Sequence, residues 1–126
     1  MNIPGDLKYT KEHEWMKIDG NTAVVGITDY AQGELGDIVF VELPGVGDTF
    51  DQEQPFATIE AVKAVSDVYA PLSGKILEVN AALDDDPMII NKDPYGDGWM
   101  VKIELSDVGQ VEKLLGAEDY QKLISE

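Results

Sequence analysis

Short apolar runs separated by glycine and proline turns fill most of this chain. Runs this short, rich in valine, isoleucine and aromatic residues, fit strands better than helices. The turn Asp19-Gly20-Asn21 between two such runs predicts a β-hairpin. The expected strands are 15–18, 24–27, 38–41 (which we expect to be buried), 56–62, 65–70, 75–79, 88–90 and 99–105. This pattern predicts an all-β sandwich or barrel.

One short helix is expected inside this β pattern. Thr28 or Asp29 can serve as the N-cap of a helix over about 30–35, because both side chains accept hydrogen bonds from backbone N–H groups. Gly36 follows directly and is suited to end the helix.

The period of the apolar residues changes near the C-terminus. From Val108 onward they recur at spacings of three and four, which predicts two short helices. Ser106 or Asp107 is the expected N-cap of the first helix, and Gly116 its expected stop. We expect both helices to pack as a lid on one side of the sheet.

We expect a single domain over residues 1–126, with a sandwich over about 7–105 and the C-terminal helices over about 107–125. The segments 36–41 and 74–79 share the pattern Gly-x-Ile-x-x-Val. Two similar β-halves around these segments would place a hairpin near the middle of the chain.

The charge of the chain excludes several function classes. Its 25 acidic and 9 basic side chains give a formal charge of −16, and every basic residue is lysine. Such a field repels nucleic-acid phosphates and anionic lipids, so binding to either is not expected. Cysteine is absent, which removes disulfides, thiolate catalysis and zinc–cysteine sites. We find no targeting segment in the sequence and expect a cytoplasmic protein.

Lys63 stands near the middle of the sequence, between two expected strands. Small neighbours such as Ala61 and Ala64 leave its amine sterically open. A solvated turn lysine is the ordinary interpretation of such a residue. A Schiff-base lysine would need desolvation, which a hairpin tip does not provide. Covalent modification by a partner enzyme is therefore a better functional hypothesis than catalysis.

The residues around Lys63 resemble the lipoylation site of the glycine cleavage system H proteins. The matching stretch is Glu60-Ala61-Val62-Lys63-Ala64, followed by Ser66-Asp67. Further stretches match the family in order and spacing: 13–15, 25–32 continuing through 35–36 to 42–44, and 94–95 with 98–100. The resemblance covers roughly residues 7–125. Ala61 stands where the family often has serine, and we interpret this as tolerable variation.

The resemblance implies a carrier and not an enzyme. The family fold is a hybrid barrel-sandwich of two antiparallel sheets, with the modified lysine on a hairpin and short C-terminal helices. Lys63 would carry lipoate as an amide. The implied partners are a pyridoxal-phosphate glycine decarboxylase, a tetrahydrofolate-dependent aminomethyltransferase, dihydrolipoyl dehydrogenase, and a lipoate ligase or a lipoyl or octanoyl transferase. We expect a monomer.

The family's behaviour also implies that the loaded arm folds back into a cleft of the carrier. A carboxylate there would bind the ammonium of the aminomethyl group by a charge-assisted hydrogen bond. Glu14 and Asp67 are the candidates, and Glu12 is a second choice. If residues 12–14 form a strand, both glutamates share one face and His13 points to the other. That alternation argues against one metal ion bound by all three.

Other interpretations of the motifs remain open. Lipoyl domains of 2-oxo-acid dehydrogenases and biotin carriers also present a lysine on a hairpin. The residues that usually flank that lysine in these two families differ from Val62 and Ala64. An H-like donor of lipoate or octanoate and an unmodified acidic interaction domain are further alternatives. Trp15 and Trp99 are interpreted as core residues, and Asp84-Asp85-Asp86 as a solvated loop.

Overall fold

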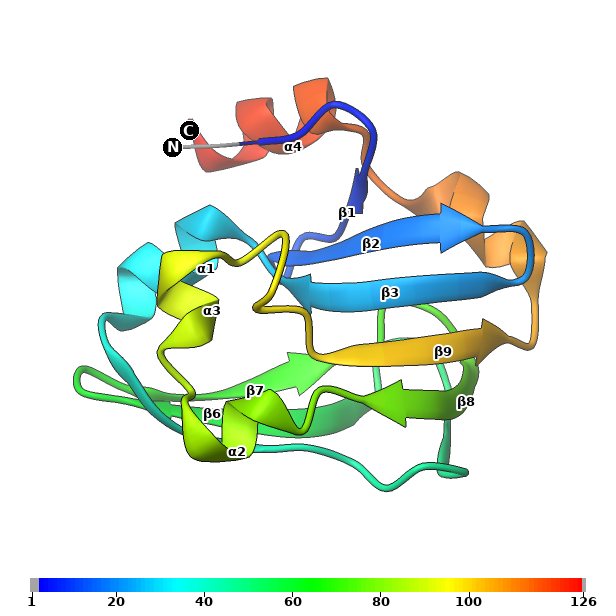
Figure 1. Cartoon of the computed structure of the whole chain (residues 1–126). Helices are drawn as coiled ribbons and strands as arrows, with labels where there is room; N and C mark the ends of the chain where they lie inside the picture. Colours follow the sequence, from blue (N-terminus) through cyan, green and yellow to red (C-terminus); the bar gives the residue numbers. More distant parts are fainter. Residues whose placement is uncertain (1–2, 126) are drawn as a thin grey trace.

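The fold consists of two antiparallel sheets with short helices at their ends. The computed structural model describes residues 3–125. The larger sheet has the strand order β1-β2-β3-β9-β8-β5, and the smaller has the order β4-β6-β7 (Figure 1). The strands are β1 (Lys8–Tyr9), β2 (Glu14–Asp19), β3 (Thr22–Ile27), β4 (Ile38–Glu42), β5 (Thr49–Phe50), β6 (Pro55–Ala61), β7 (Val65–Tyr69), β8 (Gly74–Val79) and β9 (Val101–Leu105). The expected β-dominated sandwich is confirmed.

The β2–β3 hairpin follows the sequence prediction closely. Glu14 pairs with Ile27 and Asp19 with Thr22, so residues 20–21 form the turn. Trp15 lies opposite Gly26, and a Cβ atom at Gly26 would come within 2.8 Å of the indole. Only glycine therefore lets the large ring of Trp15 lie flat across the neighbouring strand.

The first helix forms as predicted. Helix α1 runs Asp29–Leu35, and the Thr28 side chain accepts a hydrogen bond from the Ala31 backbone N–H. Gly36 ends the helix at φ 79°, ψ −158°, a conformation that favours glycine.

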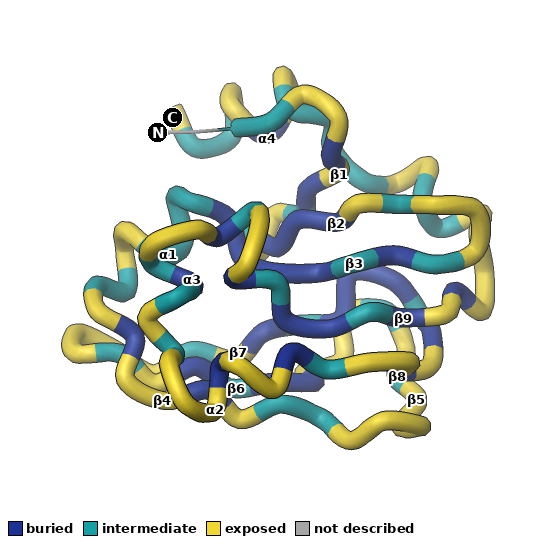
Figure 2. The backbone as a smooth tube through the Cα atoms, viewed as in Figure 1, coloured by how far each residue is buried: buried dark blue, intermediate teal, exposed yellow. Residues whose placement is uncertain are grey.

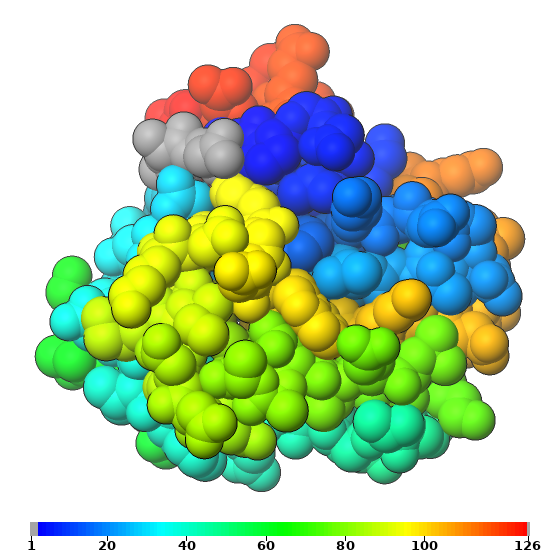
Figure 3. Space-filling model, in the orientation of Figure 1, coloured from blue at the N-terminus to red at the C-terminus, as the bar shows by residue number. Residues whose placement is uncertain are grey.

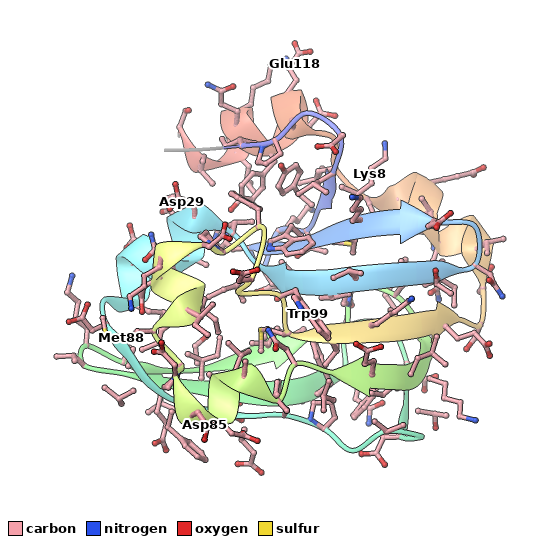
Figure 4. All side chains as sticks on the ribbon, in the orientation of Figure 1. Lys8, Asp29, Asp85, Met88, Trp99 and Glu118 are labelled. Atoms are coloured by element: carbon pink, nitrogen blue, oxygen red, sulfur yellow. The ribbon has the colours of Figure 1, made fainter. Side chains whose placement is uncertain are left out.

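The segment between β8 and β9 differs from the sequence prediction. The expected strand at 88–90 is wrong, because Ile89 and Ile90 lie in the short helix α3 (Ile89–Lys92). The acidic loop is also partly helical, in α2 (Ala82–Asp85). Each helix buries a single apolar residue, Leu83 or Ile90, so a short apolar run alone could not distinguish helix from strand here. In Figure 4, Asp85 and Met88 mark the outer side of this segment, which forms the front left surface in Figure 3.

The C-terminal region contains one 3-10 helix, η1 (Val108–Lys113), and one α-helix, α4 (Ala117–Ile124). Asp107 is the N-cap of η1, as expected. The role expected of Gly116 is wrong: it is the N-cap of α4, with an extended backbone, and η1 has already ended at Lys113. Helix α4 packs near β1 at the top of Figure 1.

Two apolar clusters form the interior. The larger lies between the sheets and includes Ile38, Ile59, Leu72 and Ile76, all at most 2% exposed. The smaller joins the N-terminal segment, β2 and α4 through Leu7, Tyr9, Trp15 and Tyr120. Most of the buried residues therefore lie along the strands, which are largely dark blue in Figure 2.

The expectation of a buried strand at 38–41 is wrong in part. Ile38 and Val41 are buried, whereas Val39 and Phe40 are 57% and 50% exposed. A register shift between Ile38 and Phe40 in the pairing with β6 explains the difference, because the bulge turns two consecutive side chains outward. The two segments that share the Gly-x-Ile-x-x-Val pattern contain strands β4 and β8. These strands lie in different sheets, β4 in the small one and β8 in the large one.

Candidate functional site

Lys63 lies at the tip of the β6–β7 hairpin. The Ala61 N–H donates to the Ala64 carbonyl at 2.8 Å, so Val62 and Lys63 form the turn between them. Residues 62–65 are all exposed, and the tip extends to the left of the molecule in Figures 1 and 2. Within residues 3–125, no hydrogen bond or ion pair engages the Lys63 amine. The amine is therefore open to a reagent or an enzyme.

The loop after α1 supports this turn from one side. The Val62 N–H donates to the Asp37 carbonyl at 3.0 Å. The aliphatic stem of Lys63 lies over Gly36, where a Cβ atom would come within 3.3 Å of Lys63 Cδ and Cε. Gly36 thus ends α1 and leaves room for the lysine stem.

Asn91 on α3 fixes the same loop. Its Nδ2 group donates to the Gly36 carbonyl and to Gln32 Oε1, both at 2.9 Å, and its Oδ1 accepts from the Ile38 N–H at 2.9 Å. These bonds span both sides of Asp37, the residue whose carbonyl holds the turn. Sequence reasoning missed Asn91, because nothing in its neighbours signals a partner in α1 and β4.

A cleft of about 430 Å³ opens at the other end of β7. The N-terminal segment, β2, the β5–β6 loop, the end of β7 and the segment after η1 form its walls. Its lining residues are Tyr9, Thr10, Lys11, Glu12, Glu14, Gln52, Glu53, Tyr69, Ala70, Pro71, Lys113, Leu114 and Leu115. Lys63 lies two residues before the start of β7 at Val65, and Tyr69, the last residue of β7, lines the cleft. The lysine and the cleft are therefore connected along one strand.

Glu14 is the buried carboxylate of this cleft. Its side chain is only 2% exposed. Thr10 Oγ1 donates to Glu14 Oε1 at 2.6 Å and accepts from the Glu14 N–H at 3.1 Å. The Tyr69 N–H, at the end of β7, approaches Glu14 Oε2 at 3.4 Å. The carboxylate is thus tied to both the N-terminal segment and the hairpin strand.

Burial raises the pKa of Glu14 from its usual 4.5 to about 7. The hydrogen bonds from Thr10 and Tyr69 favour the charged form and oppose this rise, whereas the negative charge of Glu12 adds to it. Near neutral pH the group therefore lies close to its titration midpoint. A cation arriving in the cleft would favour the ionised form.

Glu12 and His13 follow a different geometry from the one predicted. The strand begins at Glu14, and His13 has φ 70°, so simple alternation does not apply to residues 12–14. The two glutamates still line the same cleft, while His13 points away. His13 Nδ1 is 2.9 Å from the Tyr120 hydroxyl, and burial lowers its pKa despite the opposing charges of Glu12 and Glu34.

Asp67 does not join Glu14 in the cleft. It is exposed midway along β7, and Thr58 Oγ1 donates to its Oδ1 at 3.3 Å. Alternation along β7 places Asp67 on the same side of the strand as Tyr69, which lines the cleft. The structure therefore puts Asp67 between Lys63 and the cleft, and Glu12 and Glu14 inside it. The contributions of Thr10 and Tyr69 to this geometry were also missed from sequence.

The remaining candidate residues have structural positions. Trp15 is buried as expected and donates from Nε1 to the Pro94 carbonyl at 2.9 Å. Trp99 packs against the same cluster but stays half-buried. Across residues 3–125, no three His, Asp or Glu side chains gather where they could hold a metal ion. No helix in this range is long and apolar enough to cross a bilayer.

Comparison with known proteins gives consistent matches. The family described as glycine cleavage H-protein matches residues 7–126. The chain is 55% identical to the glycine cleavage system H protein of Carboxydothermus hydrogenoformans, over 98% of this chain and 95% of that protein. It is 56% identical to the same protein of Staphylococcus saprophyticus over the full length of both. A crystal structure of a glycine cleavage system H protein from Mycobacterium marinum superposes with a TM-score of 0.90 at 44% identity, covering 98% of this chain and 100% of that one.

Proposed function

The chain belongs to the glycine cleavage H-protein family, the lipoyl carriers of the glycine cleavage system, and we propose that Lys63 bears the lipoyl group. The single observation that carries this proposal is the exposed amine at the hairpin tip, which no other side chain of the described residues engages. An amide there would remove one positive charge and take the formal charge from −16 to −17.

The residues around Lys63 suit such an attachment. Gly36 leaves room for the lysine stem, and the Asp37 carbonyl holds the turn in place through Val62. When bound, the lipoyl dithiolane supplies the sulfur chemistry that carries the aminomethyl group. The protein itself supplies position: it raises the effective concentration of the carried group at each partner.

The proposed partners are the glycine decarboxylase, the aminomethyltransferase, dihydrolipoyl dehydrogenase and the enzyme that attaches lipoate. The charge of −16 supports steering toward basic surfaces of these enzymes. The same charge opposes self-association, so we propose a monomer. We also propose a cytoplasmic location, as expected from the sequence.

The cleft is proposed to receive the loaded end of the arm. Asp67 lies on the side of β7 that leads to it, and Glu14 offers a buried oxygen for an ammonium group. Because the pKa of Glu14 is about 7, binding of a cation would be accompanied by partial release of a proton from this carboxyl. Glu12 adds a second negative charge at the cleft wall.

The decisive experiment combines intact mass with a lysine variant. Protein from its native source is expected to gain the mass of a lipoyl amide on the Lys63 peptide, and Lys63→Arg is expected to abolish glycine decarboxylation while the protein stays folded. Lys75→Arg, at another exposed lysine, is the matched control and should keep full activity. Protein that is never modified would favour an unmodified interaction domain, and activity retained by Lys63→Arg would end the proposal.

The role of the cleft needs a separate test. Glu14→Gln combined with Asp67→Asn is expected to speed hydrolysis of the aminomethyl adduct, measured as its half-life after isolation. Asp84→Asn combined with Asp85→Asn, at exposed carboxylates of the α2 segment, is the matched control. An unchanged half-life in the first variant would remove these two acids from the proposed role.

A further inference from the structure

Exposed apolar side chains gather beside Lys63. Among residues 3–125, six large apolar residues are at least half exposed, and four of them lie in or next to the small sheet. These four are Val39 (57%), Phe40 (50%), Val62 (72%) and Val65 (66%), here called the hairpin patch. The other two, Val46 and Val108, belong to the β4–β5 loop and to η1. Exposed apolar side chains gathered on one part of the surface are typical of interaction sites.

The strand register shows how the patch is built. Phe40 pairs with Glu60 and Glu60 pairs with Val65, so the three side chains form one row across the outer face of the small sheet. Val41 and Ile59, the next pair, are buried on the inner face. The bulge in β4 adds Val39 to the exposed set, because it inserts one residue opposite β6. A regular strand would have turned one of these two apolar residues inward.

The three strands of the patch carry only acidic charges, and the cation of Lys63 lies in the turn between two of them. Strands β4, β6 and β7 carry Glu42, Glu60 and Asp67 and contain no lysine. The complementary surface is an apolar depression bordered by lysine or arginine side chains.

We propose that the hairpin patch is the docking surface of the enzyme that acylates Lys63. This inference rests on the proposed role of Lys63. An enzyme that acylates the amine must bring its active site to Lys63 Nζ and must therefore cover the residues beside the turn. Enzymes that act on the far end of a finished arm can work at a distance from the turn. The patch lies beside the attachment point, in the turn itself and on the neighbouring strand β4, so it fits the first kind of partner.

The reaction that such docking serves is an acyl transfer. The unprotonated Lys63 nitrogen forms a bond to the carbonyl carbon of an activated acyl donor, an acyl adenylate or thioester. The bond between that carbon and its leaving group breaks, and the nitrogen gives up one proton. No oxidant or reductant is needed. The patch takes no part in the bond changes and contributes to association only.

The test measures acylation of the purified chain by a lipoate–protein ligase supplied with lipoate and ATP. Val39→Ser combined with Phe40→Ser is expected to raise KM for the carrier about tenfold or more and to leave kcat within about twofold, as the loss of a central apolar contact does at interfaces. Val108→Ser, at a valine of nearly equal exposure (56%), is the matched control and should keep KM within about twofold. The wild-type KM should also rise with ionic strength, because the proposed contact includes charges of opposite sign.

Two results would overturn the inference. The first is an unchanged KM in the double variant, or an equal rise in the Val108→Ser control. The second comes from lipoylated protein: if the double variant loses turnover with the glycine decarboxylase while its acylation is normal, the patch serves that enzyme. Failure of the proposed function itself gives a different signature, since wild-type protein would then receive no acyl group at Lys63.

Discussion

The two ends of strand β7 present opposite environments to their functional side chains. At one end, Lys63 and its neighbours are exposed, and the turn is held by single backbone hydrogen bonds. At the other end, Glu14 is 2% exposed and sits beside a cluster in which Tyr9 and Tyr120 stack at 4.7 Å between ring centroids. The tip is suited to exchange of partners, and the cleft is suited to retention of a small group.

The comparison shows how the two ends of one hairpin strand can serve both needs. Stability comes from buried contacts, and these are dense around the cleft and sparse at the tip. Accessibility at Lys63 therefore costs the fold little, because the turn contributes almost no buried surface. The following predictions test this division between the two ends.

The largest stability effect is expected at the cleft end, from Tyr120→Ala. Tyr120 is fully buried, and its hydroxyl lies 2.7 Å from Thr28 Oγ1 and 2.9 Å from His13 Nδ1. Removing a large buried aromatic side chain lowers the free energy of unfolding by about 3–5 kcal/mol. Denaturant unfolding measures the change. A loss below about 1 kcal/mol would show that this end is not the more stable one.

Glu14→Gln is expected to stabilise the protein at pH 8 and not at pH 4. Because the folded-state pKa of about 7 exceeds the usual 4.5, the folded protein binds more protons between these values, and its free energy of unfolding falls as pH rises. The variant lacks this fall and gains at most about 3 kcal/mol above pH 7. Unfolding curves from pH 4 to 8 measure the difference. Asp67→Asn, at an exposed carboxylate, is the control and should follow the wild-type profile. If the free energies of unfolding of Glu14→Gln and wild type differed by the same amount at every pH, the prediction would be contradicted.

Asn91→Ala is expected to loosen the tip from a distance. The variant leaves the Gly36 carbonyl and the Ile38 N–H without their partner, at a cost of about 1–3 kcal/mol if both stay unsatisfied. Hydrogen exchange at the Val62 N–H, which bonds to Asp37, should become faster than in wild type. Exchange at the Thr28 N–H, which bonds to the His13 carbonyl near the cleft, is the internal control and should change less.

The smallest effect is expected from Val62→Ala. This side chain is 72% exposed, so its removal should change the free energy of unfolding by no more than about 0.5 kcal/mol. Together with Tyr120→Ala, it compares a side chain at each end of the hairpin strand. A cost above 1 kcal/mol would show that the tip contributes to the core after all.

Much of the fold could be predicted from local sequence signals. The Asp19-Gly20-Asn21 turn, the Thr28 cap and the Asp107 cap each depend on neighbours within a few residues. The family assignment is confirmed by the matches to glycine cleavage system H proteins. The strand expected at 88–90 is wrong because its apolar run is too short to show a period.

The candidate site was less accessible to sequence reasoning. Glu14 could be named from the resemblance, but its burial depends on Thr10 and on Tyr69, which lies 55 residues away along the chain. Asn91 acts across 53 residues on Ile38. Such contacts are set by tertiary packing, for which a single sequence gives no periodic signal.

The contacts of Tyr120 with His13 and Thr28 can form during translation only after α4 has been synthesised. The ribosome delivers Lys63 and both strands of its hairpin long before it delivers α4. The cleft wall at residues 113–115 and the buried tyrosine arrive after them. A growing chain therefore contains the complete lysine turn before the pocket around Glu14 can close.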